Sequence, residues 1–321
     1  MPSVSYSALW FLFALVLLAV GGDSVVRGAA GLARRLGWPP FAVGLAIVAL
    51  ATSIPELVVN FYAVAQGQGD LALGNAVGSN VVNVGLTLAV AAMVAPLLVR
   101  WRALAHLLVV VLAATALVLL MSLDGRLSML DGAILLVAFV VVFVLKILRS
   151  RENSPEVHAQ IESVTAGVGS IAVDLLRLVI AAVALFFGAK LLVGHAPALG
   201  QVMGLTPLVT GLLPVAIGTA LPEVAGAVRA ARRGNGDLVA GHVIGSSLVN
   251  ILLVLGGMAL LSHGLSIPAS FVRYELPAAF VFVAMLLPIL RGDMRVSRGE
   301  GAVLGVALLG WIVFELLMLH R

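Results

Sequence analysis

The chain contains no cysteine among its 321 residues, so it forms no disulfide bond and offers no thiolate ligand to a metal. Charged residues are also scarce, at 11% of the total, whereas a soluble domain carries about a quarter. Hydrophobic residues make up 62%, and the mean hydropathy is +1.16. This composition indicates an integral membrane protein, so the lipid bilayer is its first expected partner.

Basic residues exceed acidic ones by 19 to 15, and the calculated isoelectric point is 10.1. Such a surplus can indicate binding to nucleic acid. Here, however, the basic residues lie in short segments between apolar runs, where lysine and arginine set the orientation of a membrane protein. We therefore expect no nucleic-acid partner.

Long apolar runs occupy most of the chain. A helix needs about 20 mainly apolar residues to cross a bilayer. The first run has no basic stretch before it and is too long for a signal peptide, so we interpret it as a membrane span. The predicted fold class is an all-α integral membrane protein with ten transmembrane helices, at residues 7–33, 41–65, 71–98, 103–122, 129–148, 170–196, 206–230, 238–262, 268–290 and 299–319.

Basic residues follow every second run. They are Arg34, Arg35, Arg100, Arg102, Lys146, Arg149, Arg151, Arg229, Arg232, Arg233, Arg291, Arg295 and Arg298. The intervening segments hold only Arg126 and Arg273. Basic loops stay in the cytoplasm, so we expect a multi-pass protein of the inner (plasma) membrane with both termini outside.

Two segments of the chain are near copies of each other. Glu56 and Glu223, Asp70 and Asp237, and Asn83 and Asn250 are all separated by 167 positions. A polar stretch at 150–168 divides the chain into five-helix halves at 1–149 and 169–321, and we expect it to be a cytoplasmic linker. Because five spans reverse the direction of entry, the halves should form an inverted repeat.

Glu56 and Glu223 each lie in the middle of an apolar run, directly after a proline. An acid within hydrocarbon is costly and is by default a functional-site hypothesis. Two carboxylates facing each other across a repeat interface would neutralise one divalent cation. The structural alternative is that each acid is protonated or pairs with a base, of which Arg27 and Lys190 are the candidates.

Hydroxyl and amide residues recur at helical spacing around both acids. Thr52 and Thr219 each lie four positions before a glutamate, and thus on the same helix face. Asn83 follows Ser79, and Asn250 follows Ser246, at the same spacing. These oxygen ligands suit hard cations such as Na⁺ and Ca²⁺ rather than zinc or copper. The alternative role for such residues is hydrogen bonding between helices.

The duplicated motifs resemble the alpha repeats of the cation/calcium exchanger superfamily, in its prokaryotic sodium/calcium exchanger branch. The matching residues are Thr52-Ser53-Ile54-Pro55-Glu56 with Gly74-Asn75-Ala76-Val77-Gly78-Ser79-Asn80-Val81-Val82-Asn83, and their partners from Thr219 and Gly241. The resemblance implies antiport of Ca²⁺ against another cation by alternating access. It also implies no enzymatic activity, no resident cofactor and no obligate protein partner.

The resemblance also implies roles for single residues. Glu56 and Glu223 correspond to the central calcium carboxylates, and Thr52 and Thr219 to carbonyl and hydroxyl ligands. Carbonyl donors at outer sodium positions correspond to Ala49 and Ala216, and the remaining oxygens to Ser53, Ser79, Ser246 and Asn83.

Three residues depart from the family pattern. Ala220 stands where serine is expected, and Asn250 where sodium-coupled members often carry aspartate. His242 replaces the asparagine found at Asn75 in the first copy, and either packs between helices or senses pH. Because a hydroxyl and a charge are missing, exchange of Ca²⁺ for H⁺ remains an alternative to exchange for Na⁺.

Two further function classes are alternatives to antiport. The sequences Gly67-Gln68-Gly69-Asp70 and Gly234-Asn235-Gly236-Asp237 resemble a motif of intramembrane aspartyl proteases. Each lies in a short loop, where glycine makes a turn and aspartate is expected to cap the next helix. A passive channel is the other alternative, but prolines at mid-membrane inside an inverted repeat favour alternating access.

Overall fold

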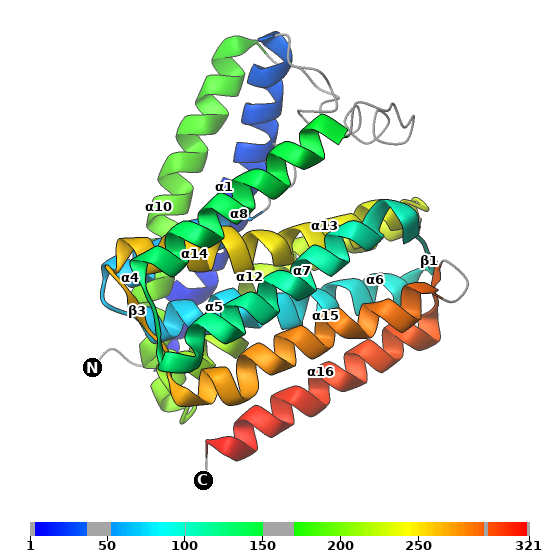
Figure 1. The fold of residues 1–321 in the computed structure, drawn as a ribbon. Coiled ribbons are helices and arrows are strands. Elements are labelled where there is room, and N and C mark those ends of the chain that lie inside the picture. Colours follow the sequence, from blue (N-terminus) through cyan, green and yellow to red (C-terminus); the bar gives the residue numbers. More distant parts are fainter. Residues whose placement is uncertain (1–3, 37–52, 100, 150–169, 292–294, 320–321) are drawn as a thin grey trace.

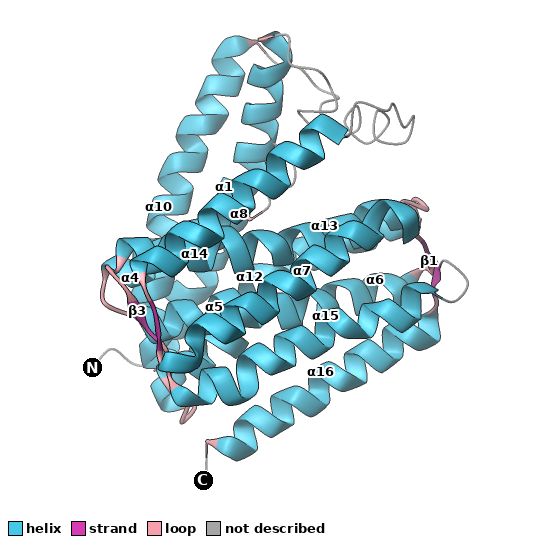
Figure 2. Ribbon diagram, viewed as in Figure 1, coloured by secondary structure: helices cyan, strands magenta, loops and turns pink. Residues whose placement is uncertain are grey.

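The computed structural model describes residues 4–36, 53–99, 101–149, 170–291 and 295–319, and these residues are almost entirely helical (Figure 2). The elements of the first half are α1 (Val4–Arg35), α4 (Ile54–Ala65), α5 (Gly69–Val82), the π-helix η2 (Asn83–Leu88), α6 (Ala89–Val94), β1 (Leu97–Leu98), α7 (Trp101–Met121), the 3₁₀ turn η3 (Ser122–Asp124), β2 (Arg126–Leu127) and α8 (Met129–Arg149).

The second half repeats this order. Its elements are α10 (Ile171–Val202), α11 (Pro207–Thr210), the π-helix η4 (Gly211–Val215), α12 (Ala216–Arg232), α13 (Gly236–Leu248), the π-helix η5 (Val249–Val254), α14 (Leu255–Leu261), β3 (Leu265–Ser266), the π-helix η6 (Phe271–Glu275), α15 (Leu276–Arg291), β4 (Arg295–Val296) and α16 (Arg298–Met318).

Membrane-spanning helices are fewer in the described residues than the ten predicted from hydropathy. Eight are long and apolar enough to cross a bilayer, and Ile54–Ala65 and Met129–Leu145 are shorter apolar helices at the positions of the other two predicted spans. The first part of the span predicted at 41–65 lies outside the described residues. An all-α membrane protein is confirmed, and the count of described spans is eight.

Helices α1 and α10 run side by side and project beyond the rest of the bundle (Figure 1). Glycines let the two backbones approach, since a Cβ at Gly21 would lie 2.7 Å from Leu185 Cγ, and one at Gly188 would lie 2.9 Å from Leu18 Cγ. Small residues at helix contacts are the usual route to close packing in lipid. An ion pair between Arg35 Nε and the buried Asp174 Oδ2, at 3.1 Å, also joins them.

In the bundle interior, α5 and η4 cross with their backbones in contact. A Cβ at Gly74 would collide with the carbonyl oxygen of Leu208, and one at Gly211 would lie 3.0 Å from Gly74 Cα. Glycine is therefore required on both sides of this crossing. The crossing holds α5, which leads to Asn83, against the segment that leads into α12 and Glu223.

Two short antiparallel strand pairs connect the halves. Leu97 and Leu98 of β1 pair with Val296 and Arg295 of β4, while Arg126 and Leu127 of β2 pair with Ser266 and Leu265 of β3. Figure 1 shows β1 and β3 at opposite ends of the bundle. The helices also pack between the halves: α8 of the first half packs on α14 of the second, and α16 of the second half packs on α6 of the first.

Candidate cation site

The asparagines predicted at the site lie where both central helices widen. The π-helix η2 begins at Asn83, and η5 contains Asn250 at its second position. A π-helix closes its hydrogen bonds over one more residue than an α-helix does, and such turns are frequent at functional sites. Both widened turns are buried. The two copies therefore share a π-helical turn at the equivalent asparagine, as well as sequence.

Glu56 lies in the first turn of α4, directly after Pro55. Ser53 is the N-cap of this helix, and both Ser53 and Glu56 are buried. A carboxylate in the first helical turn interacts favourably with the partial positive charge of the exposed N–H groups. The first turn of α4 thus holds one acid in the buried interior, next to the buried Ser53.

Glu223 is placed differently from its counterpart. A proline within a helix usually disrupts the preceding turn, but α12 continues as an α-helix from Ala216 through Pro222 to Arg232. Pro222 has no N–H to donate, which leaves the carbonyl of Gly218 without its usual intrahelical partner. The irregular backbone of this segment lies earlier, in η4, which contains Pro214.

Glu56 and Glu223 are neighbours, and their carboxylates would repel each other if both were ionised. Glu56 Oε2 and both oxygens of Glu223 are buried and make no hydrogen bond. Arg27 Nε binds Asp23 Oδ2 at 2.8 Å instead, and within the described residues no lysine or arginine pairs with either glutamate. The site therefore holds two acidic side chains without a lysine or arginine partner, and a bound cation would balance their charge when both are ionised.

Ser246 of α13 connects three segments of the site. Its hydroxyl oxygen accepts a hydrogen bond from Asn83 Nδ2 at 3.1 Å, and Ser53 Oγ lies 3.3 Å away in hydrogen-bonding geometry. Asn83 donates through its amide nitrogen, and its Oδ1 is buried without a hydrogen-bond partner. An amide oxygen in that state is available to a cation.

Asn250 shows the same division of its amide, but with another partner. Asn250 Nδ2 donates to Asn80 Oδ1 at 3.4 Å, and Asn250 Oδ1 is buried and unpartnered. We did not single out Asn80 as a site residue. Its counterpart in the second copy, Ser247, donates instead to the carbonyl of Val243 at 2.9 Å. The difference between Asn80 and Ser247 at equivalent positions was the one sequence feature that could have drawn attention to Asn80.

The other predicted residues fall into three groups. Ser79 and Ala216 are buried, and Ser79 Oγ has no hydrogen-bond partner. Thr219 Oγ1 bonds back to its own helix, at 3.0 Å from the Val215 carbonyl and 3.2 Å from that of Ala216. Thr52 and Ala49 lie outside the described residues.

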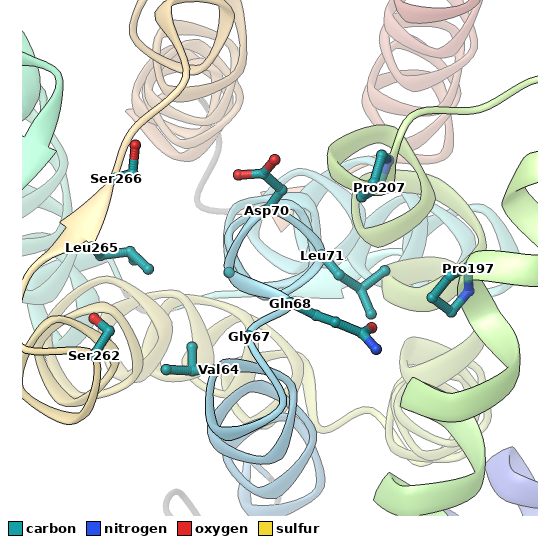
Figure 3. Close-up of a pocket in the computed structure, with 11 residues that line it drawn as sticks. Val64, Gly67, Gln68, Asp70, Leu71, Pro197, Pro207, Ser262, Leu265 and Ser266 are labelled. Carbon is teal, nitrogen blue, oxygen red and sulfur yellow. The ribbon is translucent and has the colours of Figure 1, made fainter.

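A cavity of about 530 Å³ lies at the turn between α4 and α5, away from these residues. Figure 3 shows Asp70 and Leu71 beside it, with Pro197 and Pro207 on one side and Ser266 on the other. No predicted cation ligand among the described residues lines it. Asp70 also departs from its predicted role as a helix cap, because Gln68 is the N-cap of α5 and Asp70 lies in the first turn.

A model of the family described as sodium/calcium exchanger protein matches residues 6–148 and 154–317 of the chain. The chain belongs to the sodium/calcium exchanger family. This membership places the chain among membrane transporters of cations. The resemblance of the duplicated motifs to this superfamily is thereby confirmed.

Individual relatives are similar over nearly their whole length. Inner membrane protein YrbG of Escherichia coli is 32% identical over 302 residues, covering 93% of each chain. Putative antiporter CaxA of Alkalimonas amylolytica is 33% identical over 313 residues, covering 95% of this chain and 97% of its own. A structure of the sodium-calcium exchanger NCX_Mj superposes with a TM-score of 0.65 at 27% identity, over 97% of this chain and 99% of the other.

Proposed function

We propose that this exchanger is a secondary active antiporter that moves Ca²⁺ across the membrane against Na⁺ by alternating access. The observation that carries the proposal is the pair of neighbouring buried carboxylates of Glu56 and Glu223, which have no basic partner among the described lysines and arginines. Two unit negative charges balance one Ca²⁺. Without the ion, their mutual repulsion in a site of low dielectric is unfavourable.

The neighbouring oxygens complete a ligand set for a hard cation. Calcium takes about six to eight oxygen ligands from carboxylates, amides, carbonyls and water. The unpartnered oxygens of Asn83, Asn250 and Ser79 support this assignment. We propose that the cation ligands are Glu56, Glu223, Thr52, Thr219, Ser53, Ser79, Ser246, Asn83, Asn250, Ala49 and Ala216.

We also propose that the chain has ten spans arranged as two inverted five-helix repeats, divided at residues 150–168. The constant separation of 167 positions and the two π-helices at equivalent places support this arrangement. So does the strand pairing, because a two-fold axis that exchanges β1 with β3 and β2 with β4 converts one strand pair into the other.

Calcium flux in proteoliposomes tests the coupling. We expect an outward Na⁺ gradient to drive uptake of radioactive Ca²⁺ to several times the level without a gradient, and an imposed pH gradient to have little effect. The driven uptake should collapse when an ionophore dissipates the Na⁺ gradient. Uptake that ignores every counter-gradient would identify a channel and contradict antiport.

Exchange of Ca²⁺ for H⁺ is the second candidate. Ala220 and Asn250 favour it, because they provide neither the hydroxyl nor the extra charge that would help to bind several sodium ions. Asn250 is neutral, and its amide nitrogen is bonded to Asn80. A response to the pH gradient with none to the Na⁺ gradient would replace Na⁺ by H⁺ in the proposal.

The proposed topology places residues 150–168 in the cytoplasm and both termini outside. Since the chain has no native cysteine, a single introduced cysteine reports its own side of the membrane. We expect Ser154→Cys to resist a membrane-impermeant maleimide in intact cells and to react once the membrane is opened. Leu123→Cys, at an exposed position between α7 and α8, should react in intact cells. The opposite pattern would invert the orientation.

A further inference from the structure

His242 of α13 lies against one of the two proposed calcium carboxylates. Its Nε2 is 3.4 Å from Glu223 Oε2, and the two side chains are only 17% and 8% exposed. Neither atom makes a hydrogen bond, although both are fully covered by the protein. The two atoms form an ion pair when the ring is protonated, and neither has a hydrogen-bond partner. When the ring is neutral, its Nε2 lone pair and the carboxylate oxygen are both available to a cation.

The duplication explains why His242 reaches the site. In the first copy the equivalent residue is Asn75, whose Nδ2 donates to Asn60 Oδ1 at 3.0 Å. The residue 167 positions after Asn60 is Ala227, which has no polar side chain. His242 therefore lacks the partner that its counterpart has, and it lies against Glu223 instead.

The separation between the two atoms suits two ligands of one metal ion. Bonds of about 2.1 Å to nitrogen and oxygen place neighbouring ligand atoms about 3.0 Å apart at a right angle and about 3.4 Å apart at a tetrahedral angle. His242 also precedes Ser246 by four residues, so both side chains project from the same face of α13. The ring nitrogen thus belongs to the same group of ligands as Ser246 and Glu223.

We propose that His242 is a nitrogen ligand of the cation site, and that this exchanger therefore binds and transports a divalent first-row transition-metal ion such as Mn²⁺ in addition to Ca²⁺. The inference rests on the proposed function, because it assigns a further substrate class to the same site. An imidazole adds little affinity for Ca²⁺, which takes oxygen ligands. It adds much more for transition metals, while carboxylate and amide oxygens still suit Mn²⁺.

The test compares binding of Mn²⁺ and Ca²⁺ to the purified exchanger and two variants. His242→Asn restores the residue that the first copy carries at this position. His263→Asn is the matched control, because His263 is exposed in a turn with φ 53°, a conformation that asparagine adopts readily. Free Mn²⁺ is counted by its six-line electron paramagnetic resonance signal, and Ca²⁺ binding is measured by competition with Mn²⁺ and directly by calorimetry.

We expect His242→Asn to weaken Mn²⁺ binding by at least about tenfold, since even loss of a group that only orients a ligand costs about 10- to 100-fold. Ca²⁺ binding should change by less than about threefold, and His263→Asn should leave both affinities unchanged. The spin-echo modulation of bound Mn²⁺ should show a directly coupled ¹⁴N nucleus that disappears in His242→Asn. Mn²⁺ should also drive counter-transport in liposomes loaded with Ca²⁺.

Equal effects of His242→Asn on Mn²⁺ and Ca²⁺, or bound Mn²⁺ without nitrogen coupling, would overturn the inference and make His242 a packing residue or a hydrogen-bond partner of Glu223. In both cases gradient-driven Ca²⁺ exchange by the parent protein would still uphold the proposed function. If Mn²⁺ bound through nitrogen but no gradient drove any Ca²⁺ flux, the metal site would be upheld and the proposed exchange would be contradicted.

Discussion

Glu56→Gln and Glu223→Gln each abolish Ca²⁺ exchange while the helical bundle still assembles. Each substitution keeps the size of the side chain and removes one negative charge from the pair. At an effective dielectric of about 20, one unit charge about 4 Å from another is worth on the order of 4 kcal/mol, and a divalent ion roughly doubles this. Transport should therefore fall by on the order of a thousandfold or more. Radioactive Ca²⁺ uptake by proteoliposomes provides the measurement.

Glu315→Gln is the matched control for both variants. Glu315 is a buried acid of α16 with an unpartnered Oε1, but it lies outside the duplicated segments. We expect this variant to retain exchange at close to the parental rate. If Glu56→Gln or Glu223→Gln, purified in good yield as a single species, also moved Ca²⁺ at the parental rate, the shared carboxylate site would be wrong.

Gly211→Ala prevents stable assembly of the bundle. The added methyl group would collide with the carbonyl oxygen of Leu71 and would lie 2.7 Å from the backbone nitrogen of Asn75. Overpacking against side chains costs about 1–3 kcal/mol, and backbone atoms cannot move aside as side chains do. We expect an aggregated or poorly expressed protein, or a melting temperature lower by many degrees, measured by fluorescence-detected size-exclusion chromatography after heating.

The control for this prediction lies on the next helix. Gly226 of α12 has open space where a Cβ would be placed, with no atom within 4 Å. Alanine also has a higher helix propensity than glycine, so Gly226→Ala should be neutral or slightly stabilising. A Gly211→Ala protein as stable as Gly226→Ala would mean that α5 and η4 do not cross with their backbones in contact.

Much of the fold class could be predicted because lipid imposes a strong rule on the sequence. Every spanning segment must be apolar and long, so hydropathy located α1, α7 and α16 to within a few residues. Hydropathy does not encode helix type. The π-helices at Asn83 and Asn250 depend on what packs around them, and so does the unbroken course of α12 through Pro222.

Repetition located more of the candidate site than residue type did. Glu56, Glu223, Asn83 and Asn250 stood out because two copies retain them at one spacing. Residues at which the copies differ were harder to interpret, and Asn80 was missed since its partner Asn250 becomes a neighbour only through tertiary packing. Thr219 showed a related difficulty, because its hydroxyl can bond either to a ligand or to the helix that carries it.

The two strand pairs restrict how such a molecule could move. They join the halves by backbone hydrogen bonds at both ends of the bundle, so the halves cannot separate at one end like a hinge without breaking a pair. Neither α1 nor α10 carries any of these strands, yet α10 packs on α4 and α1 packs on α12. If the proposed alternating access operates, α1 and α10 are therefore the helices that could move together across the rest of the bundle without breaking either strand pair.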